Sequence, residues 1–239
     1  MSTRPALFGL AVLALGAGCN PTTTYSGYDM VDAFPVDGER AWVFVNDAKP
    51  YDLRVEMSSA ADRVGEVDVH TFEFYDNDLG DLLMTMRWSS DTIHGVLLHG
   101  YETVAEEPTG QGGDDTGGDD TGDTGDGARG PLEAVTYDPP IQFVDRKMIV
   151  GESVETETGG ATWTSTFLAQ EDCPNHLLSG DLAPSCYKIG LDDGDGDPMV
   201  GQKPAGTWWI ATRYTLIYFQ LSGDSDKWVL ADYDWSPAE

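Results

Sequence analysis

Apolar and polar residues alternate with a period of two along much of this chain, and this pattern limits its secondary structure more than any other feature. Residues 51–57 are the plainest case, because Leu53, Val55 and Met57 alternate with charged residues. Successive side chains of a β-strand point to opposite faces, so the pattern predicts a strand with one apolar face and one wet face.

The same kind of pattern recurs through the sequence and predicts an all-β fold. Strands are expected at residues 41–45, 51–57, 67–75, 82–88, 93–98, 141–143, 148–150, 152–158, 161–168, 186–191, 207–221 and 227–235. Residues 207–221 are long for one strand, and we expect them to bend or split near Arg213. No segment has the 3.6-residue period of an amphipathic helix. We therefore predict a single antiparallel β-sheet domain, a sandwich or a half-barrel, over residues 29–235.

A segment rich in Gly, Asp and Thr interrupts this domain at residues 106–130. It contains no aromatic or large aliphatic residue to anchor it, glycine raises the entropy cost of ordering, and its like charges repel. We expect a disordered acidic insert. Long surface loops cost little free energy, so one domain with an insert is favoured over two small domains. A calcium-binding nonapeptide repeat is disfavoured because the required apolar residue is missing.

The N-terminus has the layout of a secretory leader. Arg4 supplies one positive charge, residues 6–15 are apolar apart from Gly9, and small residues lead to Cys19. The apolar run is too short to span a bilayer core, which takes about 20 residues. A signal peptide is expected at residues 1–18, followed by a polar tether at residues 19–28.

Residues 13–19 resemble the lipobox of bacterial lipoproteins, in which cleavage occurs before a Cys that is then acylated. The resemblance implies that Cys19 is the lipidated first residue of the mature chain, although Gly16 stands where the usual Leu would be. An ordinary signal peptide that contains a Cys is the alternative. Because Asn20 does not resemble an inner-membrane retention signal, we expect lipid anchoring to the outer membrane or cell surface, which makes the membrane the first partner.

The two remaining cysteines form a natural pair. Export brings the chain into an oxidising compartment, so we expect a disulfide between Cys173 and Cys186. The alternative is a zinc site made of Cys173, His176 and Cys186, which has no evident fourth ligand.

The charge of the chain excludes one class of partner. The formal net charge is −29, with 42 acidic and 13 basic residues. Such a surface repels nucleic acid and anionic headgroups, so we expect no nucleic-acid partner, and a protein, glycan or lipid partner stays open.

One acidic segment resembles the start of an EF-hand loop. Asp193, Asp195 and Asp197 occupy alternate positions, as calcium ligands do. Pro198 then stands where that loop requires Gly, and Pro204 where it requires Glu. We expect no cofactor, with weakly bound Ca²⁺ at this acidic tip as the alternative and a solvated turn as the simpler reading.

Aromatic residues crowd the C-terminal part of the chain. If exposed, Trp208, Trp209, Trp228 and Trp235 would form a platform for sugar rings or acyl chains. The segment 207–221 is apolar on both faces, however, with Trp208 and Tyr218 expected on one face and Trp209 and Phe219 on the other. This is typical of a central strand, so burial in the core is favoured.

The sequence shows no catalytic motif. No Ser, including Ser89, lies in a Gly-x-Ser-x-Gly frame, and there is no phosphate-binding Gly-rich loop followed by Lys. His94 and His99 are five residues apart, which places them on opposite faces of a strand without a bulge. We expect surface or edge histidines and no catalytic residues.

The whole layout resembles uncharacterised bacterial lipoproteins, with a lipobox, Asp-Thr-Gly repeats and a β-rich body that contains residues 137–140 and 204–208. The resemblance implies no catalytic residues. We expect a membrane-anchored, surface-exposed acidic β-domain, a non-catalytic structural or binding module. The alternatives are a lipid or lipoprotein carrier with an apolar half-barrel cavity, and a secreted hydrolase that uses unpaired carboxylates.

Overall fold

Antiparallel pairing joins thirteen of the described strands into one large sheet. The computed structural model describes residues 27–34, 36, 38–58, 62–104, 132–173, 185–194, 204–212 and 214–236. The strands of the large sheet are β2 (Glu39–Val45), β3 (Leu53–Met57), β4 (Asp62–Val64), β5 (Val67–Asp76), β6 (Leu82–Asp91), β7 (Gly95–Val104), β8 (Leu132–Val144), β10 (Ser153–Thr158), β11 (Ala161–Asp172), β12 (Ser185–Asp193), β13 (Gly206–Ala211), β14 (Thr215–Leu221) and β15 (Trp228–Ser236).

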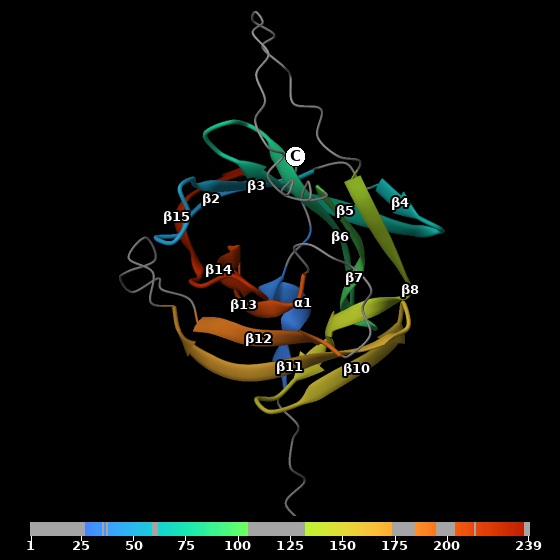
Figure 1. Cartoon of the computed structure of the whole chain (residues 1–239). Helices are drawn as coiled ribbons and strands as arrows, with labels where there is room; N and C mark the ends of the chain where they lie inside the picture. Colours follow the sequence, from blue (N-terminus) through green and yellow to red (C-terminus); the bar gives the residue numbers. More distant parts are fainter. Residues whose placement is uncertain are drawn as a thin grey trace, which may run out of the picture.

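The sheet curls into a nearly closed, barrel-like ring (Figure 1). One series of neighbours runs from β2 to β8 and another from β10 to β15, and β15 pairs with β2 to join them. The two outermost strands, β8 and β10, lie side by side and are joined by a hydrogen bond from the backbone N–H of Gln142 to Thr156 Oγ1. Strands from both sides of residues 106–130 thus belong to one sheet. The predicted all-β fold with antiparallel pairing is confirmed, whereas the acidic insert itself lies outside the described residues.

The short helix α1 (Met30–Ala33) lies inside the ring (Figure 1). Met30, Ala33 and the following Phe34 are fully buried. The two-residue strand β1 (Tyr28–Asp29), which leads into α1, pairs with β9 (Lys147–Met148) in a small separate sheet. A four-residue helix carries too little periodicity for a sequence pattern to reveal, which is why the sequence did not predict it. No helix among the described residues is long and apolar enough to cross a membrane.

Alternation along the strands decides which side chains fill the ring. In β3, Leu53, Val55 and Met57 are buried and their neighbours are partly exposed, as the sequence predicted. The interior is packed mainly with aromatic side chains. The largest of the fully buried ones are Trp42, Trp88, Trp163, Trp208, Trp228, Tyr101, Phe34, Phe44, Phe72, Phe74, Phe143 and Phe167.

The aromatic stretch at residues 207–221 is split, as expected, into the hairpin of β13 and β14. Trp208 is paired with Phe219, and their rings stack in the core with centroids 5.4 Å apart. Trp209 is paired with Tyr218 on the other face. The predicted grouping of Trp208 with Tyr218 is therefore wrong, because the turn and a bulge after Trp209 change the parity between the two strands.

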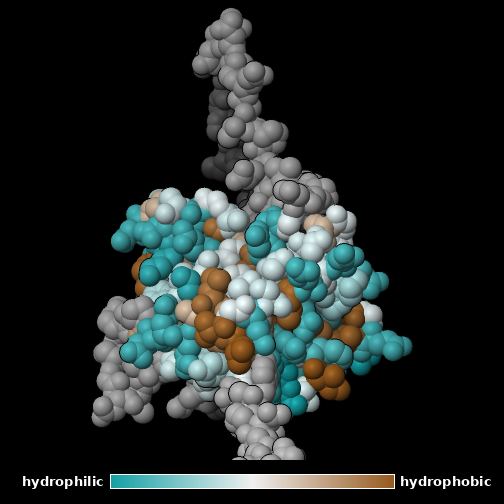
Figure 2. Space-filling model, turned by 90° about the horizontal axis from the view of Figure 1, so that it is seen from below, coloured by the Kyte–Doolittle hydropathy of each residue, from teal (hydrophilic) through white to brown (hydrophobic). Residues whose placement is uncertain are grey.

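The outer face of the ring is largely hydrophilic. Viewed from the side on which β10 and β11 lie, the surface shows a few hydrophobic groups among many hydrophilic ones (Figure 2). Exposed aliphatic side chains include Ile149, Val150 and Leu168. Most large apolar side chains therefore lie inside the ring. A ligand would bind in a hollow of the outer wall.

Candidate functional site: a groove beside His99

The candidate site begins with an irregularity in β7 at His99. On the β6 side, Arg87 pairs with Gly100 and Trp88 with Leu98, so His99 is one residue too many for its neighbour strand. A β-bulge of this kind re-aims the side chain of the extra residue, and bulges are frequent beside functional sites.

The β8 side of His99 is irregular too. Leu98 pairs with Ile141 and Gly100 with Thr136, so four residues of β8, 137–140, lie opposite the single residue His99. This bulge of β8 contains a cis peptide bond between Asp138 and Pro139. Because of the irregular pairing with both β6 and β8, His99 has no single partner residue in either neighbouring strand.

Gly100 permits the strands to come together again directly after the bulge. A Cβ atom at this position would lie 2.2 Å from the carbonyl oxygen of Val135 on β8. A residue with a side chain would push β7 and β8 apart at this point. The close approach therefore requires glycine, which fixes the backbone next to His99.

The His99 side chain meets Ser89 of β6. Ser89 Oγ lies 2.7 Å from His99 Nε2, and the two residues are only 8% and 3% exposed. Burial lowers the pKa of the His99 ring from its usual value near 6.5, because the charged form loses its hydration. The pair is therefore uncharged at neutral pH.

A groove of about 860 Å³ lies over this pair. Its apolar lining includes Val64 and Val67 of the β4–β5 hairpin, Leu97 of β7, and Pro139 and Pro140 of the β8 bulge. Polar groups come from Ser89, His99 and neighbouring residues of β8 and β10. Mostly apolar surroundings with a few convergent polar groups are typical of small-molecule sites.

Carboxylates surround this groove. Asp91 is the last residue of β6, Asp138 belongs to the β8 bulge, and Glu155 and Glu157 lie on β10. All four residues are exposed. Within the part of the chain that the structure describes, no Lys or Arg lines the groove. The site thus combines an apolar and neutral interior with a negative rim.

Asp91 organises the turn at one end of the groove. Its carboxylate accepts hydrogen bonds of 2.6 Å from the backbone N–H groups of Ile93 and His94, and one of 3.0 Å from His94 Nδ1. Partial burial would raise the pKa of Asp91, but these hydrogen bonds outweigh it and the pKa is lowered. The carbonyl of His94 in turn accepts a hydrogen bond from Gln142 Nε2 at 2.9 Å. The turn is therefore tied to β8.

The groove also lies over the seam between β8 and β10. The backbone N–H of Gln142 donates to Thr156 Oγ1 at 3.0 Å, and the buried Ser165 hydroxyl of β11 donates to the carbonyl of Phe143. Side-chain hydroxyls thus satisfy backbone groups that a regular ladder would pair. The strands on the two sides of the groove are joined by these bonds.

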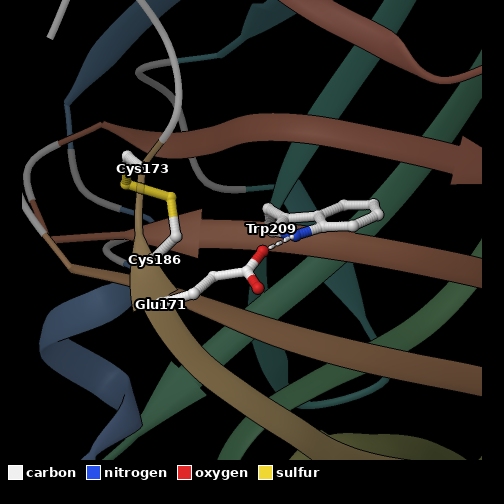
Figure 3. Close-up of a disulfide and its surroundings, with 4 residues drawn as sticks. All are labelled: Glu171, Cys173, Cys186 and Trp209. Carbon is white, nitrogen blue, oxygen red and sulfur yellow. Dashed lines mark hydrogen bonds between the residues drawn. A yellow bond between two sulfur atoms is a disulfide. The ribbon is translucent and has the colours of Figure 1, made fainter.

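The predicted disulfide is present. Cys173, just after β11, is bonded to Cys186, at the start of β12 and 13 residues further along the chain (Figure 3). Beside this disulfide the indole N–H of Trp209 donates to Glu171 Oε1 at 2.6 Å. The disulfide excludes the zinc alternative for these two cysteines, and His176 lies outside the described residues.

The alternative of an exposed aromatic platform is wrong for three of its four tryptophans. Trp208 and Trp228 are each 1% exposed and belong to the core. Trp209 is 8% exposed, with the ammonium groups of Lys188 and Lys227 lying 4.9 Å and 5.8 Å from its ring centroid. These side chains cover the ring and leave no open face for a sugar. The side chain of Trp235 is not among those described.

The remaining predicted site residues are placed only in part. Asp193 is the last residue of β12 and pairs with Trp163, whereas Asp195 and Asp197 lie outside the described residues, as does Cys19. Within the described ranges, no group of three or more His, Cys, Asp or Glu side chains is arranged to hold a metal ion.

Sequence reasoning missed the Ser89–His99 pair. It treated His99 as a surface or edge residue on the face opposite to His94, whereas His99 is buried and both histidines line the groove. The reason is the bulge, which breaks the period-two rule at this residue. Two signals were present in the sequence: Gly100 beside His99, and the Pro139–Pro140 pair in a segment otherwise rich in strand-forming residues.

No protein-family model, no curated protein and no solved structure matches this chain. Any functional conclusion must therefore come from the groove and from the sequence itself.

Proposed function

We propose that this chain is an exported, lipid-anchored binding module, attached through Cys19 to the outer membrane or cell surface, and that the groove beside His99 is its binding site. The observation that carries the proposal is the groove itself: about 860 Å³ of hollow in the outer wall of a ring whose interior is filled. Ligand sites commonly measure about 300–1,000 Å³.

Two features support an exported, anchored protein. The Cys173–Cys186 disulfide fits an oxidising compartment, where such bonds persist. The lipobox-like residues before Cys19 supply the anchor.

The packed core favours binding at the outer wall over a carrier with an internal cavity. A hollow at one end of the core, bounded by Tyr51, Phe74 and Trp228 among others, measures about 10 Å³. That volume is about one water-sized probe and far below that of an acyl chain. The aromatic interior thus acts as a rigid support for the wall that carries the groove.

The anchor is tested by replacing Cys19 with Ser and separating membranes from soluble material. We expect the wild-type protein to sediment with membranes and to partition into detergent, whereas the Cys19→Ser protein loses its acyl chains and is released. Continued acylation or detergent partitioning of the variant would contradict the anchor.

The groove is tested by adding small-molecule fragments to the full chain in detergent and following the ring resonances of His99 and His94. We expect a subset of fragments to shift the His99 signal, and a Thr156→Trp variant, which fills the groove, to abolish the shift. A control Leu79→Trp variant, a highly exposed position between β5 and β6 outside the residues that line the groove, should leave it unchanged. Failure of every fragment to reach His99 would refute the binding site.

The Ser89–His99 pair makes a hydrolase the second candidate. In such an enzyme, Ser89 Oγ bonds to an ester carbonyl carbon as its proton passes to the neutral His99, the alcohol leaves with that proton, and water then releases the acid. Known sites of this type orient the base with a third group. Within the described residues, no carboxylate is hydrogen-bonded to the other ring nitrogen of His99, which is why a binding role is preferred.

A fluorophosphonate probe distinguishes these two candidates, because it reacts with an activated serine. We expect no labelling of Ser89 by mass spectrometry. Labelling that disappears in a His99→Gln variant would replace the binding module with the hydrolase.

A further inference from the structure

We infer that the groove beside His99 takes an aliphatic amine that carries more than one positive charge, such as a free polyamine. This inference rests on the groove being a binding site, as proposed above. It follows from the match between the groove and such a molecule in charge, in charge spacing and in apolar surface.

The first argument is charge. Asp138, Glu155 and Glu157 line the groove, and none of their carboxylates forms an ion pair or hydrogen bond with another residue of the described ranges. The fourth carboxylate, that of Asp91, is occupied by His94 and the turn. Lys and Arg are missing from the described lining of the groove, so an anionic ligand would meet only repulsion, whereas a cation would neutralise an existing excess of negative charge.

The second argument is the spacing of these charges. Glu155 and Glu157 are two residues apart on β10 and have the same exposure in its alternating pattern, so they share its outer face. Same-face positions of a strand lie about 7 Å apart. Asp138 lines the same groove from the β8 bulge. A ligand that satisfies all three carboxylates needs charges separated by several bonds, which a compact metal ion or a single ammonium group does not provide.

The third argument is the surface between the charges. Val67, Leu97, Pro139 and Pro140 supply apolar contacts along the groove, and Val67 alone is 44% exposed. Methylene groups between the charges of a polyamine would cover this surface, in the way that lysine stems cover apolar patches in proteins. Strongly hydrated polyols gain nothing from such contacts.

The interior of the groove does not oppose a cation. The Ser89–His99 pair is buried, uncharged and hydrogen-bonded internally at 2.7 Å. It therefore adds no positive charge beside the ligand, and its ring provides a reporter at the bottom of the site.

The experiment measures binding of spermidine to the full chain in detergent by calorimetry, with the His99 ring resonance as the reporter of location. Glutarate serves as the anionic probe, triethylene glycol as the neutral probe, and trilysine as the peptide probe. The groove variant is Asp138→Asn, Glu155→Gln and Glu157→Gln together. The matched control removes three exposed carboxylates outside the groove: Asp78→Asn, Asp192→Asn and Asp234→Asn.

We expect spermidine to bind and to shift the His99 resonance, and glutarate and triethylene glycol to do neither. Each exposed charge pair contributes a few-fold to affinity at most, so losing three of them should weaken binding by about tenfold. The control should change it by less than about twofold. A native His99 resonance in the free groove variant shows that the variant is folded.

Several results would overturn the inference. Equal weakening by the two triple variants would reveal only general attraction to an acidic protein. Binding of the neutral or anionic probe at His99, without spermidine, would refute the ligand class and leave the proposed binding function standing. Trilysine binding more than about tenfold tighter than spermidine would assign the groove to a basic peptide instead. Absence of spermidine binding in a protein whose groove binds fragments would also refute the ligand class alone.

Discussion

Phe34 connects α1 to the aromatic core, and replacing it with Ala tests whether the helix stabilises the ring. The side chain is fully buried. Its ring stacks on Phe72 with centroids 5.7 Å apart, and lies 5.2 Å from Trp88 and 5.7 Å from Phe143. These three partners belong to β5, β6 and β8, so the side chain directly after α1 packs against strands on one half of the ring.

The expected loss of stability follows from these contacts. Deleting a buried Phe side chain costs about 3–5 kcal/mol, because transfer free energy is lost and a cavity remains. The closely packed aromatic partners restrict relaxation, so we expect about 4 kcal/mol for Phe34→Ala. Phe34→Leu keeps most of the volume and should cost about 1.5 kcal/mol. Domains of this kind have about 5–15 kcal/mol of stability in total, so both variants should fold but the Ala variant only marginally.

The assay is equilibrium unfolding of the full chain in urea, followed by the combined fluorescence of its seven tryptophans, one of which, Trp88, lies beside Phe34. Ile93→Ala is the control, because Ile93 is 75% exposed and should change the free energy of unfolding by no more than about 0.5 kcal/mol. If Phe34→Ala lost less than about 1 kcal/mol with an unchanged urea dependence, α1 would not be an integral part of the core.

Three further predictions concern the disulfide, His99 and the seam. Replacing both Cys173 and Cys186 with Ser should lower the free energy of unfolding by about 3 kcal/mol, because the bond no longer restricts the loop in the unfolded chain. Reductant should lower the free energy of unfolding of the wild type by the same amount. An effect of reductant on the double variant would point to another cause. Burial lowers the pKa of His99, so the unfolded chain binds a proton at this ring more readily than the folded protein does. His99 should therefore reduce the free energy of unfolding as the pH falls from the usual pKa near 6.5 towards the lowered folded pKa, and should have no effect above that range. A His99→Gln variant should lose less stability than the wild type between about pH 7 and 5 in urea unfolding, and identical pH slopes of the two proteins would contradict the buried neutral ring. Ser165→Ala should cost about 1–3 kcal/mol by leaving the buried carbonyl of Phe143 without its donor, and amide exchange should quicken in β8 and β10; the exposed Ser153→Ala is the control, and an equal effect of the two would argue against the seam.

Much of the fold could be predicted from the sequence because its signals are local. Alternation in residues 53–57 identified the buried face of β3, and the apolar residues on both faces of residues 207–221 indicated a central strand. The pairing of Cys173 with Cys186 followed from the small number of cysteines in a chain that we expect to be exported. Each inference needed only neighbouring residues or a count.

The candidate site was not predictable in the same way. His99 lines the groove only because β6 supplies one residue too few beside it and β8 supplies four residues opposite it. Such mismatches depend on the register of strands that are far apart in sequence. The hairpin of β13 and β14 shows the same effect, since the partner of Trp208 depends on the number of residues in the turn.

The sequence by itself thus determined that this chain is a β-sheet protein with a filled aromatic core, and pointed to export and to a cysteine pair. Only the tertiary structure decided that the sheet curls into a nearly closed ring, that α1 lies inside it, and that Ser89 and His99 meet beneath a negatively charged groove. The physical reason is that side-chain alternation is set by each strand's own backbone, whereas register, bulges and closure are set by hydrogen bonds to partner strands.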